Sequence, residues 1–209
     1  MAFPRALAVA ELGWSPKARL GWDDFNRRAQ GDVARLRRMG FAAAESAWRT
    51  DPEPGPLRRE NRELATCTQK IAIALEDDAP VRGERAVFLT DIMNPCWIWP
   101  AAELDGVTAI RVDVGQLPFN FQIGDDVQKI VLAPPRTPAG ELEVRLDGCG
   151  GEPVAILPLV TAVANPAVTR LEAPLPGGGR HDLCFTFTRA SVDPIWAVGA
   201  VELVKGAGR

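Results

Sequence analysis

The sequence contains no tyrosine, a single histidine and no pair of cysteines separated by two residues. With one histidine, a catalytic triad or a histidine metal site would depend wholly on His181. Without closely spaced cysteine pairs there is no zinc-finger pattern, so we expect no metal. The formal net charge is −3, whereas a nucleic-acid surface is normally basic. We therefore expect no nucleic-acid partner.

No apolar run approaches the ~20 residues that a helix needs to cross a membrane, so we expect no membrane partner. Residues 1–11 lack the basic region and the long apolar stretch of a signal peptide. Phosphate-loop and dinucleotide fingerprints are missing, since GGGR at 177–180 lies between predicted strands and does not open a helix. No cofactor is expected.

The first 48 residues predict two helices. Residues 4–12 are rich in alanine and leucine, and Pro4 suits a first helical turn. A second helix begins near Trp22, and Gly40 is placed to end it. Apolar residues recur along this helix at the spacing of one buried face. They are Trp22, Phe25, Ala29, Val33 and Leu36.

Beyond residue 48 the pattern changes. Residues 49–63 contain three prolines and alternating charges, which is typical of a linker. Residues 64–205 contain about eight short runs with β-type alternation, separated by turns such as Asp-Gly at 105–106 and 147–148. Many short strands with no helical pattern between them predict a β-sandwich of jelly-roll type. The expected fold is mostly β, with a short helical segment at residues 1–48.

All four cysteines, Cys67, Cys96, Cys149 and Cys184, fall in the β region. Two alternatives follow: two disulfides in an extracytoplasmic domain, or buried free thiols. Four cysteines allow three pairings, and the spacing does not choose among them.

The N-terminal residues carry a dense pattern: Pro-Arg, spaced alanines, Ala-Glu, Trp-Ser, Trp-x-x-Phe and a closing Leu-x-x-x-Gly. This pattern resembles the end of the catalytic barrel of family 20 glycoside hydrolases, the β-N-acetylhexosaminidases. One departure is Trp48-Arg49, which lies later than the Tyr-Arg usual in the family. The matching positions are Pro4, Arg5, Ala8, Ala10, Glu11, Trp14, Ser15, Trp22, Phe25, Leu36 and Gly40.

The resemblance implies hydrolysis of terminal N-acetylhexosamine residues by a substrate-assisted mechanism that requires an Asp-Glu dipeptide. This sequence contains no such dipeptide, so no catalytic residue carries over. The chain is expected to be the C-terminal portion of such an enzyme and inactive by itself. The parent enzyme would be periplasmic or secreted.

Residues 179–204, GRHDLCFTFTRASVDPIWAVGAVELV, resemble more loosely the galactose-binding-like sandwiches and the family 6-type carbohydrate-binding modules. Cys184 stands where an aromatic residue is usual. The resemblance implies the fold type and a structural hydrogen-bonding role for His181. The positions that fit are Gly179, His181, Asp182, Leu183, Phe185, Phe187 and Trp196.

A sugar site needs an aromatic plane flanked by polar groups. Trp97 and Trp99 alternate with Ile98, so both point to one side of an extended segment, near Asn94 and Glu103. These four residues, Trp97, Trp99, Asn94 and Glu103, are the predicted carbohydrate site. The alternative is that the tryptophans fill the core.

Two weaker clusters lie in residues 118–126. Phe119 and Phe121 alternate with amides, which predicts either a binding edge or a strand with a core side. Asp125 and Asp126 could hold calcium or form a solvated turn.

Three functions remain open. The chain is the C-terminal segment of a β-N-acetylhexosaminidase; or a carbohydrate-binding module, binding through Trp97 and Trp99; or a structural domain. In the last case the helix face of Trp22, Phe25, Val33 and Leu36 would dock onto a catalytic barrel or a second copy of the chain. A glycan containing N-acetylhexosamine is the expected ligand of the first two.

Overall fold

The computed structural model describes residues 5–17, 21–41, 57–68, 72–76, 86–165 and 167–206. The chain divides into two compact units, one of Met1–Glu53 with Val81–Glu84 and one of Pro54–Pro80 with Arg85–Arg209. Within the described ranges, no helix combines the length and the apolar character needed to span a bilayer.

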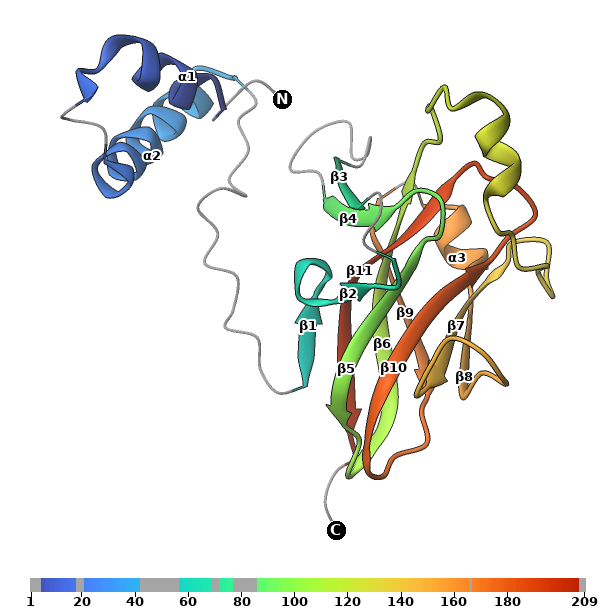
Figure 1. Ribbon diagram of the computed structural model, residues 1–209. Coiled ribbons are helices and arrows are strands. Elements are labelled where there is room, and N and C mark those ends of the chain that lie inside the picture. The colour runs from blue at the N-terminus through green and yellow to red at the C-terminus, as the bar shows by residue number, and fades with distance from the viewer. Residues whose placement is uncertain are drawn as a thin grey trace. The chain divides into compact units, whose positions relative to one another are not determined.

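The first unit contains two helices, α1 (Arg5–Trp14) and α2 (Trp22–Arg38) (Figure 1). α2 carries Asp23 and Asp24 in its first turn and three arginines in its last, which complements the helix dipole. Gly40, with φ of 85°, takes the left-handed conformation that commonly ends a helix. Both predicted helices are confirmed. α2 begins at Trp22 and ends before Gly40 as predicted, whereas α1 extends to Trp14, two residues beyond the predicted end.

An ion pair joins the two helices. Arg28 of α2 donates to both carboxylate oxygens of Glu11 of α1, at 2.7 and 3.0 Å, and donates to Asp24 at 2.9 Å. The hydrogen bond from Arg28 holds the pKa of Glu11 below its ordinary value. The pair of Glu11 with Arg28 therefore connects α1 to α2.

The predicted apolar face of α2 is buried only in its middle. Ala29 and Val33 are each 3% exposed, whereas Trp22 is 64% exposed with its ring centroid 5.9 Å from that of Phe25. Docking of this face onto a barrel or a second copy of the chain stays a prediction.

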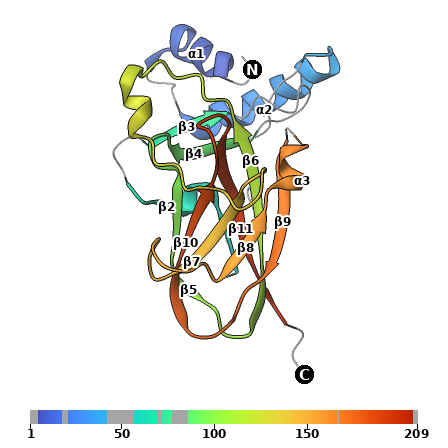
Figure 2. The same cartoon turned by 90° about the vertical axis from the view of Figure 1, so that its right-hand side faces the viewer.

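The second unit is built from antiparallel strands in two main sheets (Figures 1 and 2). The strand orders are β1-β11-β6-β9 and β2-β5-β10-β7-β8, and β3 pairs with β4 separately. The predicted mostly β fold with a short N-terminal helical segment is confirmed. The elements are β1 (Arg58–Glu60), η3 (Asn61–Glu63), β2 (Ala65–Thr66), β3 (Ala72–Glu76), β4 (Val87–Asp91), β5 (Cys96–Glu103), β6 (Val107–Leu117), η4 (Gly124–Lys129), β7 (Glu141–Leu146), β8 (Ala155–Pro158), α3 (Val160–Val163), β9 (Thr169–Pro174), β10 (Arg180–Thr188) and β11 (Ile195–Lys205).

Alternating residues build the core between the two sheets. Leu183 and Phe185 of β10 and Val112 and Val114 of β6 are all fully buried in a single hydrophobic cluster. Burying one such side chain contributes roughly 1.5–3 kcal/mol. Successive residues of a strand point to opposite faces. Cys184, which lies between Leu183 and Phe185 in β10, therefore points away from the core.

Residues 58–63 belong to the sandwich, so their prediction as part of a linker is wrong. β1 pairs antiparallel with β11, with Arg59 opposite Val201, and η3 follows it. The strand is a short, charged edge strand, and such strands carry little hydrophobic pattern. Residues 49–56 of the predicted linker lie outside the described residues.

Asn61 connects η3 to two strands. Its Nδ2 donates to the carbonyls of Leu89 at 3.0 Å and Val198 at 2.7 Å, and its Oδ1 accepts from the backbone N–H of Leu89 at 2.5 Å. β4 is held to β6 as well, since Phe88 packs so closely on Gly115 that a Cβ there would lie 2.3 Å from the ring. The absence of a side chain at Gly115 thus makes room for Phe88.

The four cysteines form two disulfides, Cys67–Cys96 and Cys149–Cys184. Of the two alternatives that the sequence leaves open, disulfides are the one observed.

We expect Asn61→Ala to lower the free energy of unfolding by about 2–4 kcal/mol, because the backbone groups of Leu89 and Val198 lose three hydrogen bonds to a buried side chain. Urea unfolding followed by tryptophan fluorescence measures this. Thr108→Ala is the matched control: Thr108 is exposed and donates a long hydrogen bond of 3.4 Å to Val204, so its loss should cost no more than about 0.5 kcal/mol. Equal losses in the two variants would contradict the role given to Asn61.

Candidate functional site

Charged and polar side chains meet on the outer face of the five-stranded sheet, the face turned away from the core. Leu142 and Val144 of β7 are fully buried in the core, so the residues that alternate with them point outward. The outward cross-strand pairs are Glu141 with Thr188, Glu143 with Thr186 and Arg145 with Cys184.

Residues 131–140 cover part of this outer face. Ala133 forms a bridge with Thr188, and its carbonyl accepts a hydrogen bond from the backbone N–H of Arg189 at 2.9 Å. As a result Glu141 is only 1% exposed and Glu143 only 3%. A buried carboxylate is costly unless hydrogen bonds or opposite charges replace its water.

Glu141 obtains hydrogen bonds from the covering segment. It accepts from the backbone N–H groups of Arg136 at 3.0 Å and Thr137 at 2.7 Å, and from the hydroxyl of Thr188. Burial alone would raise the pKa of Glu141, but these hydrogen bonds outweigh it and hold the pKa below the ordinary 4.5. The carboxylate is therefore ionised, and it anchors the covering segment.

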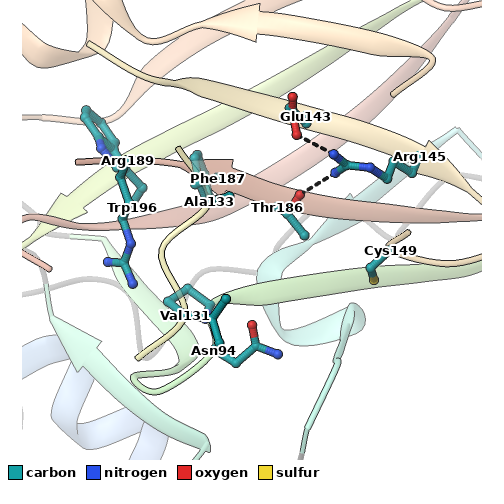
Figure 3. Close-up of a pocket in the computed structure, with 11 residues that line it drawn as sticks. Asn94, Val131, Ala133, Glu143, Arg145, Cys149, Thr186, Phe187, Arg189 and Trp196 are labelled. Carbon is teal, nitrogen blue, oxygen red and sulfur yellow. Dashed lines mark hydrogen bonds and ion pairs between the residues drawn. The ribbon is translucent and has the colours of Figure 1, made fainter. Parts of the chain in front are cut away.

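Glu143 is neutralised by two arginines. Arg136 and Arg145 each donate to it at 2.5 Å. Arg145 also donates to the hydroxyl of Thr186 at 2.8 Å (Figure 3). Its Nε donates to the carbonyl of Gly151 at 2.8 Å. Each carboxylate oxygen of Glu143 thus pairs with a guanidinium group.

A pocket of about 160 Å³ lies beside this network (Figure 3). Arg145, Thr186 and Glu143 form part of its wall, with Asn94 from the loop before β5. Phe187, Arg189 and Trp196 also line it.

Arg189, directly after β10, is the unusual member of this wall. It is 7% exposed, and its Nη1 donates to the carbonyl of Val192 at 3.2 Å. Its Nη2 has no hydrogen-bond partner among the residues that the structure describes. Burial lowers the pKa of Arg189 below its ordinary value, although a guanidinium stays protonated in proteins. A buried donor without a partner costs about 1–3 kcal/mol, more when it is charged, and an oxygen atom of a ligand would satisfy it.

The apolar part of the wall includes Pro95, Val131 and Ala133, and two aromatic residues of the core also reach it. Phe187 and Trp196 stack with their centroids 6.3 Å apart, and Phe187 meets Trp97 edge to face at 5.9 Å. Phe187 and Trp196 are only 7% and 3% exposed, whereas Val131 is 73% exposed. The pocket therefore offers amide, hydroxyl and guanidinium groups together with the exposed apolar side chain of Val131.

The predicted tryptophan platform is not on the surface. Trp97 and Trp99 are 0% and 2% exposed and belong to the core, which is the alternative that the sequence leaves open. Trp97 donates from Nε1 to the carbonyl of Leu89 at 2.9 Å, and the guanidinium of Arg59 lies 4.9 Å from the ring centroid of Trp99. Large apolar residues at alternate positions are typical of a strand that has one side in the core. Both rings lie on that buried side, so neither ring face is open to a sugar.

The other two predicted site residues are separated from each other. Asn94 lines the pocket before the start of β5. Glu103 lies at the far end of β5, where it pairs with Arg180 at 3.3 Å. The four predicted residues thus do not form one site, and Asn94 alone reaches the pocket.

The weaker predictions have structural roles. Phe119 and Phe121 are half-buried against the core with their ring centroids 5.6 Å apart. Asp126 pairs with Lys129 at 2.5 Å within the exposed helix η4. His181 Nδ1 lies 2.8 Å from Asp147, which lowers the pKa of that carboxyl and fits the expected hydrogen-bonding role.

Sequence reasoning missed Arg145 and Arg189, and it took Phe187 and Trp196 only as marks of the fold. A signal was present for Arg145, because ELEVRL alternates apolar with charged residues and so predicts a charged outer face. Nothing in the sequence shows that residues 131–140 fold over that face and bury it.

No family model matches this sequence, and no curated protein matches it either. Solved structures with similar chains include a family 6 carbohydrate-binding module from Clostridium cellulolyticum in complex with xylose, at 16% identity and a TM-score of 0.45, covering 71% of this chain and 96% of that one. CsCBM6-3 from Clostridium stercorarium, in complex with cellobiose, aligns at 12% identity and a TM-score of 0.46, covering 75% and 100%.

A β-1,3-glucan binding family 6 module from Bacillus halodurans aligns at 13% identity and a TM-score of 0.46, covering 72% of this chain and 97% of that one. At these TM-scores the likeness carries no argument about ligands. The function is therefore argued from the residues of the pocket. No family 20 glycoside hydrolase is among the similar proteins named here, so that resemblance stays a prediction.

Because the folded pKa of Glu141 is depressed, its contribution to stability is complete above pH 4.5 and is lost as the pH falls through the lower folded value. We expect wild-type stability to decline in this acid range, and the Glu141→Gln variant to be less stable at neutral pH by about 1–3 kcal/mol and to decline less in acid. Urea unfolding between pH 7 and pH 3 measures both.

Glu152→Gln is the control for this experiment, because Glu152 is exposed in the loop before β8. Its unfolding curve should follow the wild type at every pH. If Glu141→Gln behaved like this control, the anchoring role of Glu141 would be wrong.

Proposed function

We propose that the β-sandwich binds carbohydrate and that the pocket on the outer face of its five-stranded sheet receives one sugar ring at the end of a glycan. The observation that carries the proposal is the unpartnered Nη2 of Arg189 in a pocket wall that also holds the exposed apolar side chain of Val131. Sugars present hydroxyl oxygens at their edges and apolar C–H faces, and this wall offers a partner for each.

The size of the pocket suits a single ring. Its volume of about 160 Å³ lies below the ~300–1,000 Å³ of pockets that enclose drug-sized ligands. A longer chain would have to continue into solvent. Recognition is then strongest for the terminal residue, with Asn94 and Thr186 as further hydrogen-bonding groups on the wall.

The pocket is built for binding rather than cleavage. Glycoside hydrolysis commonly needs two carboxyl groups, one of which donates a proton. Glu143 is the one carboxylate among the described residues that line this pocket, and two arginines hold it.

We further propose that the ligand is a glycan containing N-acetylhexosamine, and that the chain is the C-terminal portion of a family 20 glycoside hydrolase. Support for the latter is the helix pair of α1 and α2, which forms where the resemblance places helices and is joined by Glu11 and Arg28. The two disulfides are consistent with a periplasmic or secreted location, because disulfides persist in oxidising compartments.

Replacing Arg189 tests the site. Arg189→Met keeps an unbranched apolar stem and removes the guanidinium donor, so we expect glycan affinity to fall about 10-fold to 100-fold, the worth of a hydrogen bond to a charged group. Stability should change little, because removal of a buried charge without a counterion offsets the loss of the hydrogen bond to the carbonyl of Val192. A glycan array with N-acetylhexosamine, neutral sugar and uronic acid end groups selects the ligand, and calorimetry then measures its affinity.

Arg170→Met is the matched control, since Arg170 is an arginine of β9, on the other sheet, with a side chain that is 52% exposed. It should bind as the wild type does. A wild-type chain that binds no glycan on the array, or an Arg189→Met variant that binds with unchanged affinity, would refute the proposed site.

The purified chain should release no chromophore from a chromogenic N-acetylhexosaminide, because the sequence holds no Asp-Glu dipeptide to orient and protonate the substrate. A standard hexosaminidase assay with an active family 20 enzyme as positive control measures this. Turnover above background would show that the chain has a catalytic site.

A further inference from the structure

The four cysteines lie in one cluster. All four sulfur atoms are within 4.8 Å of one another. Between the two disulfides, Cys67 Sγ is 3.4 Å from Cys149 Sγ, and Cys96 Sγ is 3.5 Å from Cys149 Sγ and 3.6 Å from Cys184 Sγ. Two independent disulfides need no such contact.

The cluster is assembled by the five-stranded sheet. Cys67 follows β2, Cys96 begins β5, Cys149 lies in the turn after β7 and Cys184 lies within β10. Because β2, β5, β10 and β7 are successive neighbours in this sheet, residues far apart in sequence reach one place on its outer face. The fold thus brings four sulfur atoms together although the sequence has no closely spaced cysteine pairs.

We propose that, when its cysteines are reduced, the chain binds one zinc ion through the thiolates of Cys67, Cys96, Cys149 and Cys184. Four sulfur ligands in a tetrahedron are the donor set of a structural zinc site. A Zn–S distance of ~2.3 Å places the sulfurs of such a tetrahedron roughly 3.8 Å apart. The three contacts of 3.4–3.6 Å between the disulfides are already close to that separation. The expectation from sequence that no metal binds is replaced by this proposal.

One ion fits this cluster better than an iron–sulfur cluster does. In a cluster of several irons the cysteines bind different metal atoms, which spreads their sulfurs apart. Here all four sulfurs lie within 4.8 Å. Carboxylate-preferring ions such as calcium are excluded by the ligand type, because thiolates select soft and borderline metals.

The surroundings suit a bound metal. Cys96 and Cys184 are 2% and 1% exposed, whereas Cys67 is half-buried and Cys149 lies in an exposed turn, so one side of the site is closed to water. Arg145 lies opposite Cys184 in the β7–β10 ladder, and its guanidinium lines the same pocket wall as Cys149. Four thiolates and one Zn²⁺ carry a net charge of −2, which a neighbouring arginine partly offsets.

The two states interconvert by balanced steps. A phosphine or dithiol reductant gives two electrons to each S–S bond, and with two protons each disulfide becomes two thiols. Zn²⁺ then displaces the protons of the four thiols and forms four Zn–S bonds. A disulfide oxidant such as oxidised glutathione reverses the sequence: its own S–S bond accepts the two electrons that each pair of cysteines loses and becomes two thiols, and the zinc ion is released.

The test uses the full chain, reduced with a phosphine in the absence of oxygen and titrated with Co²⁺ as a spectroscopic substitute for zinc. We expect thiolate-to-cobalt charge-transfer bands and tetrahedral ligand-field bands that saturate at one equivalent and vanish when zinc is added. With zinc bound, all four thiols should react with iodoacetamide at least ten times more slowly. The emission of buried Trp97 and Trp99 reports whether the sandwich is folded.

Cys149→Ser should weaken metal binding by at least the roughly 10–100-fold that loss of an outer-shell partner costs. Ile98→Val is its control, because Ile98 lies opposite Cys184 on the neighbouring strand and has no ligand atom. A reduced chain that is unfolded without metal and folds when zinc is added supports the proposal. A reduced chain that shows no cobalt–thiolate bands and equal alkylation with and without zinc overturns it, whether that chain is folded or unfolded.

Discussion

The burial of β10 on both of its faces is the constraint on which the rest of the sandwich depends. One face meets the hydrophobic core through Leu183 and Phe185, and the other is covered in part by residues 131–140. Charged residues on that second face lose their water and must find partners within the protein. Glu141 finds them in backbone N–H groups, and Glu143 finds them in two arginines. The covering segment is thus held by the groups that it buries.

The same burial explains why one group is left over. Residues 131–140 reach Thr188 and the backbone of Arg189, and where this cover ends the pocket begins. Arg189 lies at that boundary, buried enough to lose water but with one donor unused. An unsatisfied buried group in an otherwise paired network indicates either a strained position or a missing partner. The place of Arg189 in the wall of a pocket favours a ligand as the partner.

Much of this architecture could be predicted from local pattern. Helix α2 follows from its apolar spacing, its terminal charges and Gly40, and the strands follow from alternation. The site could not be predicted in the same way, because its residues come from six separate places in the chain: the loop before β5, the start of the covering segment, β7, the turn after β7, the end of β10 with Arg189, and β11. The tryptophan pair shows the difficulty. Alternation placed Trp97 and Trp99 on one side of a strand correctly, but which side faces the core depends on the partner strands, and here their side is the buried one.

Arg145 connects the pocket with the cysteine cluster. It pairs with Glu143 in the wall of the pocket, and its Nε donates to the carbonyl of Gly151, at the end of the turn that carries Cys149. A change in the bonding of Cys149 would therefore also move Arg145, which lies in the pocket wall and pairs with Glu143. Sugar affinity and cysteine oxidation need not be independent in this protein. Arg189 is not one of the four sulfur ligands, so its replacement tests sugar binding while all four cysteines are kept. Either the sugar-binding proposal or the zinc proposal can therefore be refuted while the other stands.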